Sequence, residues 1–215
     1  MNYFDFVPIE LIEIAVSYLN NDDFESFVKF KNVNFINWTN ICRLHFNDLN
    51  LCKQIHDYED YLKFLNIERL KERFELDENI INVYNLRTLY LNNNNIEILP
   101  REIFDLWNLE YLFLSGNKIK EIPEEIKKMY NLKVLKLDNN NIEILPKELF
   151  KLSRLGTLSL LGNNIREISD EISNLKNLHF LNLNSLINYD RDRIQSLLPN
   201  TIIKYRKLTK YNLKK

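Results

Sequence analysis

The sequence predicts an α/β fold: a right-handed solenoid of stacked coils, with parallel strands on its concave face, preceded by a small helical domain. Three observations support this. From Leu86 onward, one pattern of leucine, isoleucine and asparagine recurs every 23 residues. Within each unit, apolar residues alternate over a few positions, which is the period of a strand. A unit of this length cannot bury its own apolar side, so copies must stack on one another.

The repeated pattern is L-x-x-L-x-L-x-x-N-x-I-x-x-[LI]-[PS]-x-x-[IL]-x-x-[LM]. The fifth copy breaks down halfway, because Leu186 stands where asparagine is expected. In the second copy, Leu112 and Leu114 predict a short strand, and Pro123 favours a turn or a short helical segment after it. Each unit is therefore one strand plus a short return segment. The five copies begin at Leu86, Leu109, Leu132, Leu155 and Leu178.

The asparagines of the pattern form one column: Asn94, Asn117, Asn140 and Asn163. An amide that faces inward is costly unless its donors and acceptor are paired. We expect these side chains to bond the backbone of neighbouring coils, where the turn leaves peptide groups unpaired. The column is therefore interpreted as scaffold.

The repeats resemble the leucine-rich repeat family. The 23-residue step and the pairs Leu99-Pro100, Ile122-Pro123 and Leu145-Pro146 are similar to the intracellular class found in Ras-pathway scaffold proteins. The resemblance implies a curved solenoid that acts as a binding surface. It implies little about the partner, because members of the family bind very different proteins.

Side chains between the strand leucines are expected to point outward on the concave face. The middle column reads Tyr90, Phe113, Lys136, Ser159 and Asn182, and the column two residues earlier reads Thr88, Tyr111, Val134, Thr157 and Phe180. Exposed aromatic residues are enriched in protein interfaces, and the repeat does not require them. Alternatively, the aromatic side chains pack against the N-terminal region or vary neutrally. The candidate protein-binding residues are Tyr90, Tyr111, Phe113, Val134, Lys136 and Phe180.

Residues 1–48 predict three short helices with more apolar surface than they can bury among themselves. The segment Val7-Pro8-Ile9-Glu10-Leu11 is followed at regular spacing by Leu19, Phe24, Phe27 and Phe30. This pattern resembles the F-box, although Val7 replaces leucine and Asn34 replaces a typical tryptophan. This resemblance implies binding to the adaptor Skp1 and, through it, to a cullin–RING ubiquitin ligase. The alternative is a private N-terminal cap of the solenoid. The candidate adaptor-binding residues are Val7, Pro8, Leu11, Leu19, Phe24, Phe27 and Phe30.

The expected organisation has four parts. Residues 1–48 form the F-box-like segment, and residues 49–85 form a helical linker and N-terminal cap, with a helix from Tyr58 to Phe74. Residues 86–184 form the repeats. Residues 185–215 form a C-terminal cap and basic tail, in which Asp190 caps a helix to Leu198 and residues 201–205 form an edge strand.

Composition argues against several other functions. The net charge is −1, which favours no class of partner and makes nucleic acid an unexpected one. Cys42 and Cys52 allow a zinc reading with nearby histidines, but their spacing and apolar surroundings favour core residues. Glu10 and Glu13 interrupt any signal peptide, and no stretch is apolar enough to span a membrane. We expect an intracellular, cytoplasmic or nuclear protein, monomeric outside its complex, with no cofactor, no metal and no enzymatic motif.

Overall fold

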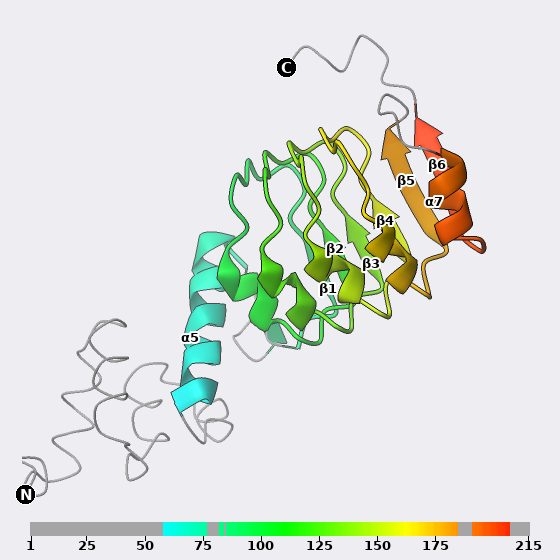
Figure 1. Ribbon diagram of the computed structural model, residues 1–215. Coiled ribbons are helices and arrows are strands. Elements are labelled where there is room, and N and C mark those ends of the chain that lie inside the picture. Colours follow the sequence, from blue (N-terminus) through cyan, green and yellow to red (C-terminus); the bar gives the residue numbers. More distant parts are fainter. Residues whose placement is uncertain (1–57, 77–81, 84, 185–190, 207–215) are drawn as a thin grey trace, which may run out of the picture. The chain divides into compact units, whose positions relative to one another are not determined.

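The computed structural model describes residues 58–76, 82–83, 85–184 and 191–206 (Figure 1). The chain divides into two compact units, residues 1–68 and 69–215. Helix α5 (Tyr58–Arg73) begins in the first unit and ends in the second. The predicted F-box-like segment, with every candidate adaptor-binding residue from Val7 to Phe30, lies outside the described residues.

The second unit contains a parallel sheet whose strands follow one another in chain order. Each strand residue of the first four pairs lies beside the residue 23 positions later, so Thr88 pairs with Tyr111 and Tyr111 with Val134. The sheet thus has the step that the sequence predicts. Its strands are β1 (Thr88–Tyr90), β2 (Tyr111–Phe113), β3 (Val134–Lys136), β4 (Thr157–Ser159), β5 (Phe180–Asn184) and β6 (Ile202–Arg206).

The core consists of leucine and isoleucine columns that the stacked coils bury together. Each short strand turns its central leucine inward, and these leucines are at most 3% exposed. The coils on either side of a unit cover its strand leucine, so a single unit could not bury that leucine alone, as expected for a solenoid. The strand leucines are Leu89, Leu112, Leu135, Leu158 and Leu181.

Four short 3-10 helices form the return segments on the side of the coils away from the strands (Figure 1). Three of them begin after Pro100, Pro123 and Pro146, whose φ values of −65°, −64° and −69° match the fixed ring geometry of proline. Ser169 replaces proline before the fourth, and its hydroxyl accepts a hydrogen bond from the Glu171 amide. The helices are η2 (Arg101–Asp105), η3 (Glu124–Lys128), η4 (Lys147–Lys151) and η5 (Asp170–Asn174).

Three of the four predicted scaffold asparagines are buried. Asn140 accepts from the Ile119 amide at 3.0 Å and donates to the Leu114 and Leu137 carbonyls at 3.0 Å. Asn117 and Asn163 repeat this arrangement. The expectation was wrong for Asn94, which is exposed and, within the described part of the chain, donates to the nearby Asn92 carbonyl. As the first of the column, Asn94 has no described coil before it whose backbone it could bond.

The sharp turns after β1, β2, β3 and β4 use positive φ at one fixed position. Asn93, Gly116, Asn139 and Gly162 hold it in successive coils, with φ between 54° and 74°. Glycine reaches this region without steric cost, and asparagine tolerates it better than most residues. The turn therefore alternates between the two residue types and repeats every second coil.

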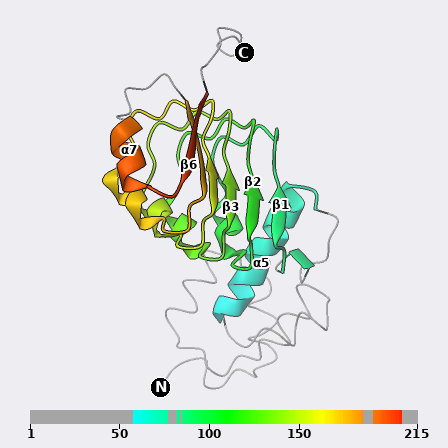
Figure 2. The same ribbon diagram turned by 90° about the vertical axis from the view of Figure 1, so that its right-hand side faces the viewer.

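The end of the solenoid contains α7 (Arg191–Leu197) and β6, which pairs in parallel with β5. Figure 2 shows both elements at the C-terminal end of the stack. The predicted helix and final strand are confirmed, and the strand is shifted by one residue. The Arg191 guanidinium lies 4.4 Å from the centre of the Tyr205 ring and so links helix to strand. The predicted cap, Asp190, lies outside the described residues.

Candidate protein-binding surface

The outward side chains of β1–β6 form one surface, which we call the sheet face. Alternation along the strands places all six candidate residues on it. Tyr90 is 67% exposed and Phe180 is 43% exposed. Lys136 is also exposed, whereas Tyr111, Phe113 and Val134 are half-buried. None of the six lies in the core.

The Tyr90 and Phe113 rings stack, with their centroids 4.7 Å apart and their planes 8° apart. The parallel register causes this, because it sets the two residues directly beside each other on β1 and β2. The Lys136 Nζ atom lies 5.4 Å from the centre of the Phe113 ring, in the favourable range for a cation beside an aromatic face. Tyr111 and Val134 are register partners alongside. We call Tyr90 and Phe113 the aromatic platform.

Ser159 departs from the sequence expectation. It belongs to the outward column, yet it is only 2% exposed. Its hydroxyl donates to Asp138 Oδ1 at 2.5 Å and accepts from Asn182 Nδ2 at 2.9 Å. The longer side chains of Asp138 and Asn182 cover this small residue. Ser159 is therefore not accessible to a binding partner.

Phe180 lies apart from the aromatic platform. Its register partners are Thr157 on one side and Ile202 on the other. Ile202 is 54% exposed, so the two residues form a second apolar spot near the C-terminal end of the sheet. Ile202 is not among the candidate residues predicted from the sequence. Only the register between β5 and β6 shows that Ile202 lies beside Phe180.

A ladder of charges lies at the residues that immediately precede β1, β2 and β3. The Glu110 carboxylate forms ion pairs with Lys133 Nζ at 2.7 Å and with the Arg87 guanidinium at 3.5 Å. The hydrogen bond from Lys133, followed by the positive charges nearby, holds the pKa of the Glu110 carboxyl below its ordinary value. Within the six strands the charged residues are Lys136, Lys204 and Arg206, and none is acidic.

Polar side chains at the ends of the strands, or just beyond them, form hydrogen bonds that hold the fold together. Asn92 Oδ1 accepts the Ser115 amide at 2.8 Å, and Asp138 Oδ1 accepts the Leu161 amide at 2.9 Å. Asn184 Oδ1 accepts the Gly162 amide at 2.7 Å. These acceptors join neighbouring coils, so this border of the sheet face is scaffold.

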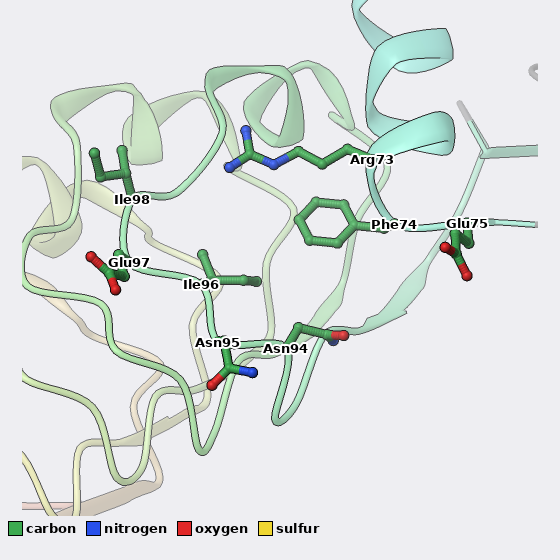
Figure 3. Close-up of a pocket in the computed structure, with 8 residues that line it drawn as sticks. All are labelled: Arg73, Phe74, Glu75, Asn94, Asn95, Ile96, Glu97 and Ile98. Atoms are coloured by element: carbon green, nitrogen blue, oxygen red, sulfur yellow. The ribbon is translucent and has the colours of Figure 1, made fainter.

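A separate depression of about 570 Å³ lies beside the first coil (Figure 3). Arg73 and Phe74 extend toward the segment from Asn94 to Ile98, and Glu75 completes the lining. Its open lining mixes both charges with apolar groups. None of the candidate residues from the sequence contributes to it.

Other kinds of site find little support in the described part of the chain. There, no group of three or more histidine, cysteine or acidic side chains is arranged to hold a metal ion. None of the described helices combines the length and the apolar character that a membrane span requires. The cysteines considered for zinc, Cys42 and Cys52, lie outside the described residues.

Two family models match the coils. One, described as leucine-rich repeats in two copies, matches residues 84–128 and 107–151, and another, described as a leucine-rich repeat, matches residues 130–185. The coils of this region thus match the leucine-rich repeat family. The predicted fold class, an α/β leucine-rich repeat solenoid with parallel strands, is thereby confirmed.

Solved leucine-rich repeat structures resemble the chain. A leucine-rich repeat protein of Leptospira interrogans has 40% identity and a TM-score of 0.55, over 58% of this chain and 33% of that one. Internalin C2 of Listeria monocytogenes has 28% identity and a TM-score of 0.50, over 59% and 54% of the two chains.

An internalin F of the same organism shares the fold, with 19% identity and a TM-score of 0.50, over 76% of this chain and 48% of that one. The chain thus spans between a third and about half of each of these proteins. A comparison with curated proteins gives no match.

Proposed function

We propose that the chain is a protein–protein interaction module whose sheet face binds a polypeptide partner. The aromatic platform is the observation that carries the proposal. Tyr90 leaves two thirds of its surface in water, although the repeat requires no aromatic residue at that position. Large exposed rings recur as energetic anchors of interfaces. The leucine-rich repeat fold supports the proposal, because solenoids present extended binding surfaces.

The sheet face is suited to recognition and provides no chemistry of its own. Its acidic border groups are already bonded, Glu110 to Lys133 and Asp138 to the Leu161 amide. The proposal therefore assigns the chain no step in which a covalent bond is made or broken.

We further propose that residues 1–48 act as an F-box that binds Skp1, so that the sheet face recruits a substrate to a cullin–RING ubiquitin ligase. The support is the sequence pattern Val7-Pro8-Ile9-Glu10-Leu11 and the apolar positions that follow it up to Phe30. An interaction module joined to an F-box is the expected architecture of a substrate-recruiting subunit. This role places the chain in the cytoplasm or nucleus.

The second candidate function is a stand-alone scaffold protein, in which the N-terminal helices only cap the solenoid. The apolar surplus of residues 1–48 supports this alternative as well, because either Skp1 or the first coil could cover it. Deleting residues 1–48 separates the two. The scaffold role predicts a large loss of solenoid stability, whereas the F-box role predicts almost none.

The test of the F-box role is direct binding of the purified chain to purified Skp1, measured by calorimetry. We expect micromolar or tighter binding by the wild type and its loss in Leu11→Asp and in Phe24→Asp. Ile144→Asp is the matched control, because it makes the same kind of change at a residue that is 75% exposed in the repeats. Failure of the wild type to bind Skp1 at micromolar concentration would refute the role.

The test of the sheet face uses two double variants in a quantitative pull-down. Tyr111→Ala with Phe113→Ala should deplete the directly bound partner at least tenfold. Ile98→Ala with Ile144→Ala removes two exposed apolar side chains outside the strands and should leave binding unchanged. Equal recovery by both variants would show that the partner binds elsewhere.

A further inference from the structure

The charged residues of the described strands are all cationic, whereas the 3-10 helices carry charges of both signs. Charged residues within the described strands are Lys136, Lys204 and Arg206, all cationic. Each of the four 3-10 helices, in contrast, carries at least one acidic residue in its first turn. The net charge of the chain is −1, so the positive charge of the sheet face is a local feature.

Among the described residues, no ion pair joins Lys136, Lys204 or Arg206 to an acidic group beside the sheet face. The Glu110 carboxylate is shared between Lys133 and Arg87. Asp138 already accepts the Leu161 amide and the Ser159 hydroxyl through Oδ1. Carboxylates of a binding partner could therefore form ion pairs with Lys136, Lys204 and Arg206.

The position of Lys136 links this charge to the aromatic platform. Its Nζ atom lies beside one face of the Phe113 ring, while Tyr90 stacks on the other side. Tyr90 is therefore the exposed end of the row Tyr90–Phe113–Lys136, and the cation is at the opposite end. An apolar group against Tyr90 and a carboxylate against Lys136 would be held two strands apart.

On this basis we propose that the partner is an acidic peptide segment with an aromatic or large aliphatic anchor, lying across the strands. Two strand spacings are about 10 Å, and an extended peptide advances about 3.3 Å per residue. The first acidic residue therefore follows the anchor by about three positions. Lys204 lies three strands beyond Lys136 in the sheet order, which places a second acidic residue about four positions further along.

This inference rests on the proposed function, because it names the chemistry of the partner at the same sheet face. The experiment is a selection from a phage library of random twelve-residue peptides on the full chain. The double variant Tyr90→Ala with Phe113→Ala is selected in parallel. We expect enriched peptides to combine an aromatic or leucine anchor with aspartate or glutamate three positions away, and the double variant to lose them.

One enriched peptide, labelled with fluorescein, is then titrated against single variants by fluorescence anisotropy. Lys136→Glu should weaken binding about tenfold, and raising the salt concentration should weaken wild-type binding, because the attraction is between exposed charges. Lys147→Glu on η4 is the matched control. It changes the net charge equally, away from the strands, and should leave the affinity unchanged.

The outcomes distinguish the inference from the function beneath it. Peptides that need Tyr90 and Phe113 but carry no acidic residue, or that bind Lys136→Glu as well as wild type, would overturn the acidic partner and leave the protein-binding role standing. If no selected peptide depends on the aromatic platform, the inference and the sheet-face function both fail.

Discussion

The side chain of Asn93 lies in the space that a Cβ atom on Gly116 would need. The two residues hold the same place in successive coils, and both have positive φ, 60° for Asn93 and 74° for Gly116. Asn139 and Gly162 repeat the relationship two coils later. Asparagine thus places its side chain toward the next coil, where glycine leaves room for it.

Gly116→Ala should therefore destabilise the solenoid by about 1–3 kcal/mol, because alanine is strained at this positive φ and the Asn93 side chain must move aside. Urea unfolding followed by circular dichroism measures this. Gly156→Ala is the control, since its φ is not positive and an added Cβ would make only ordinary contacts, the nearest 3.6 Å from the Lys133 carbonyl oxygen. Similar losses in both variants would contradict the steric explanation.

Asn140→Ala should cost about 1–3 kcal/mol, since it leaves the buried Ile119 amide without its acceptor. It also removes one of the two asparagine donors from the Leu114 and Leu137 carbonyls. Asn94→Ala removes the same chemical group from an exposed position and should change the free energy of unfolding by less than about 0.5 kcal/mol. The comparison uses the same urea titration. A large loss in Asn94→Ala would show that the first asparagine is structural after all.

The 23-residue period predicted the fold because stacking places equivalent residues of successive repeats next to one another. The leucine ladder and the buried Asn117, Asn140 and Asn163 follow from it directly. The same reasoning failed at Asn94, since a repeat rule assumes a preceding coil. It also failed at Ser159, because alternation gives the direction of a side chain and says nothing of the longer neighbours that cover it.

The two-coil period was present in the sequence but was missed. Residues 93–100 and 139–146 are identical, N-N-N-I-E-I-L-P, and they lie two coils apart. A consensus pattern for a single repeat does not show the alternation of asparagine and glycine between successive repeats. Ile202, in contrast, could not be placed from sequence, because its contribution to the sheet face depends on the register between β5 and β6. The F-box-like segment and the binding role of the sheet face stay predictions.

Tyr90 and Leu89 are adjacent in β1 but face opposite sides, which allows a sharp test of the sheet face. Tyr90→Ala should shift the melting temperature by no more than a few degrees, because the ring is 67% exposed. Leu89→Ala should cost about 2–5 kcal/mol, because Leu89 is 3% exposed within the leucine ladder. Calorimetry of both variants measures the contrast, and a large loss for Tyr90→Ala would place its ring in the core.

Glu110 should titrate below the ordinary range of glutamate. The hydrogen bond from Lys133 lowers its pKa, and nearby positive charges add to this. Because the folded-state pKa is lower than the unfolded one, its stabilising contribution is complete above the unfolded pKa and is lost as the pH falls through the folded value. The measurement is a carbon-13 NMR titration of the Glu110 carboxyl group.

In that titration, Lys133→Gln should raise the Glu110 midpoint more than Arg87→Gln does, since Lys133 lies at 2.7 Å and Arg87 at 3.5 Å. Added salt should raise the wild-type midpoint toward the ordinary value, because screening weakens exposed charge pairs. If neither substitution moves the midpoint, the ladder does not exist in solution. Glu110 would then be free to oppose an acidic partner at the sheet face, which would weaken the case for the carboxylate-bearing peptide.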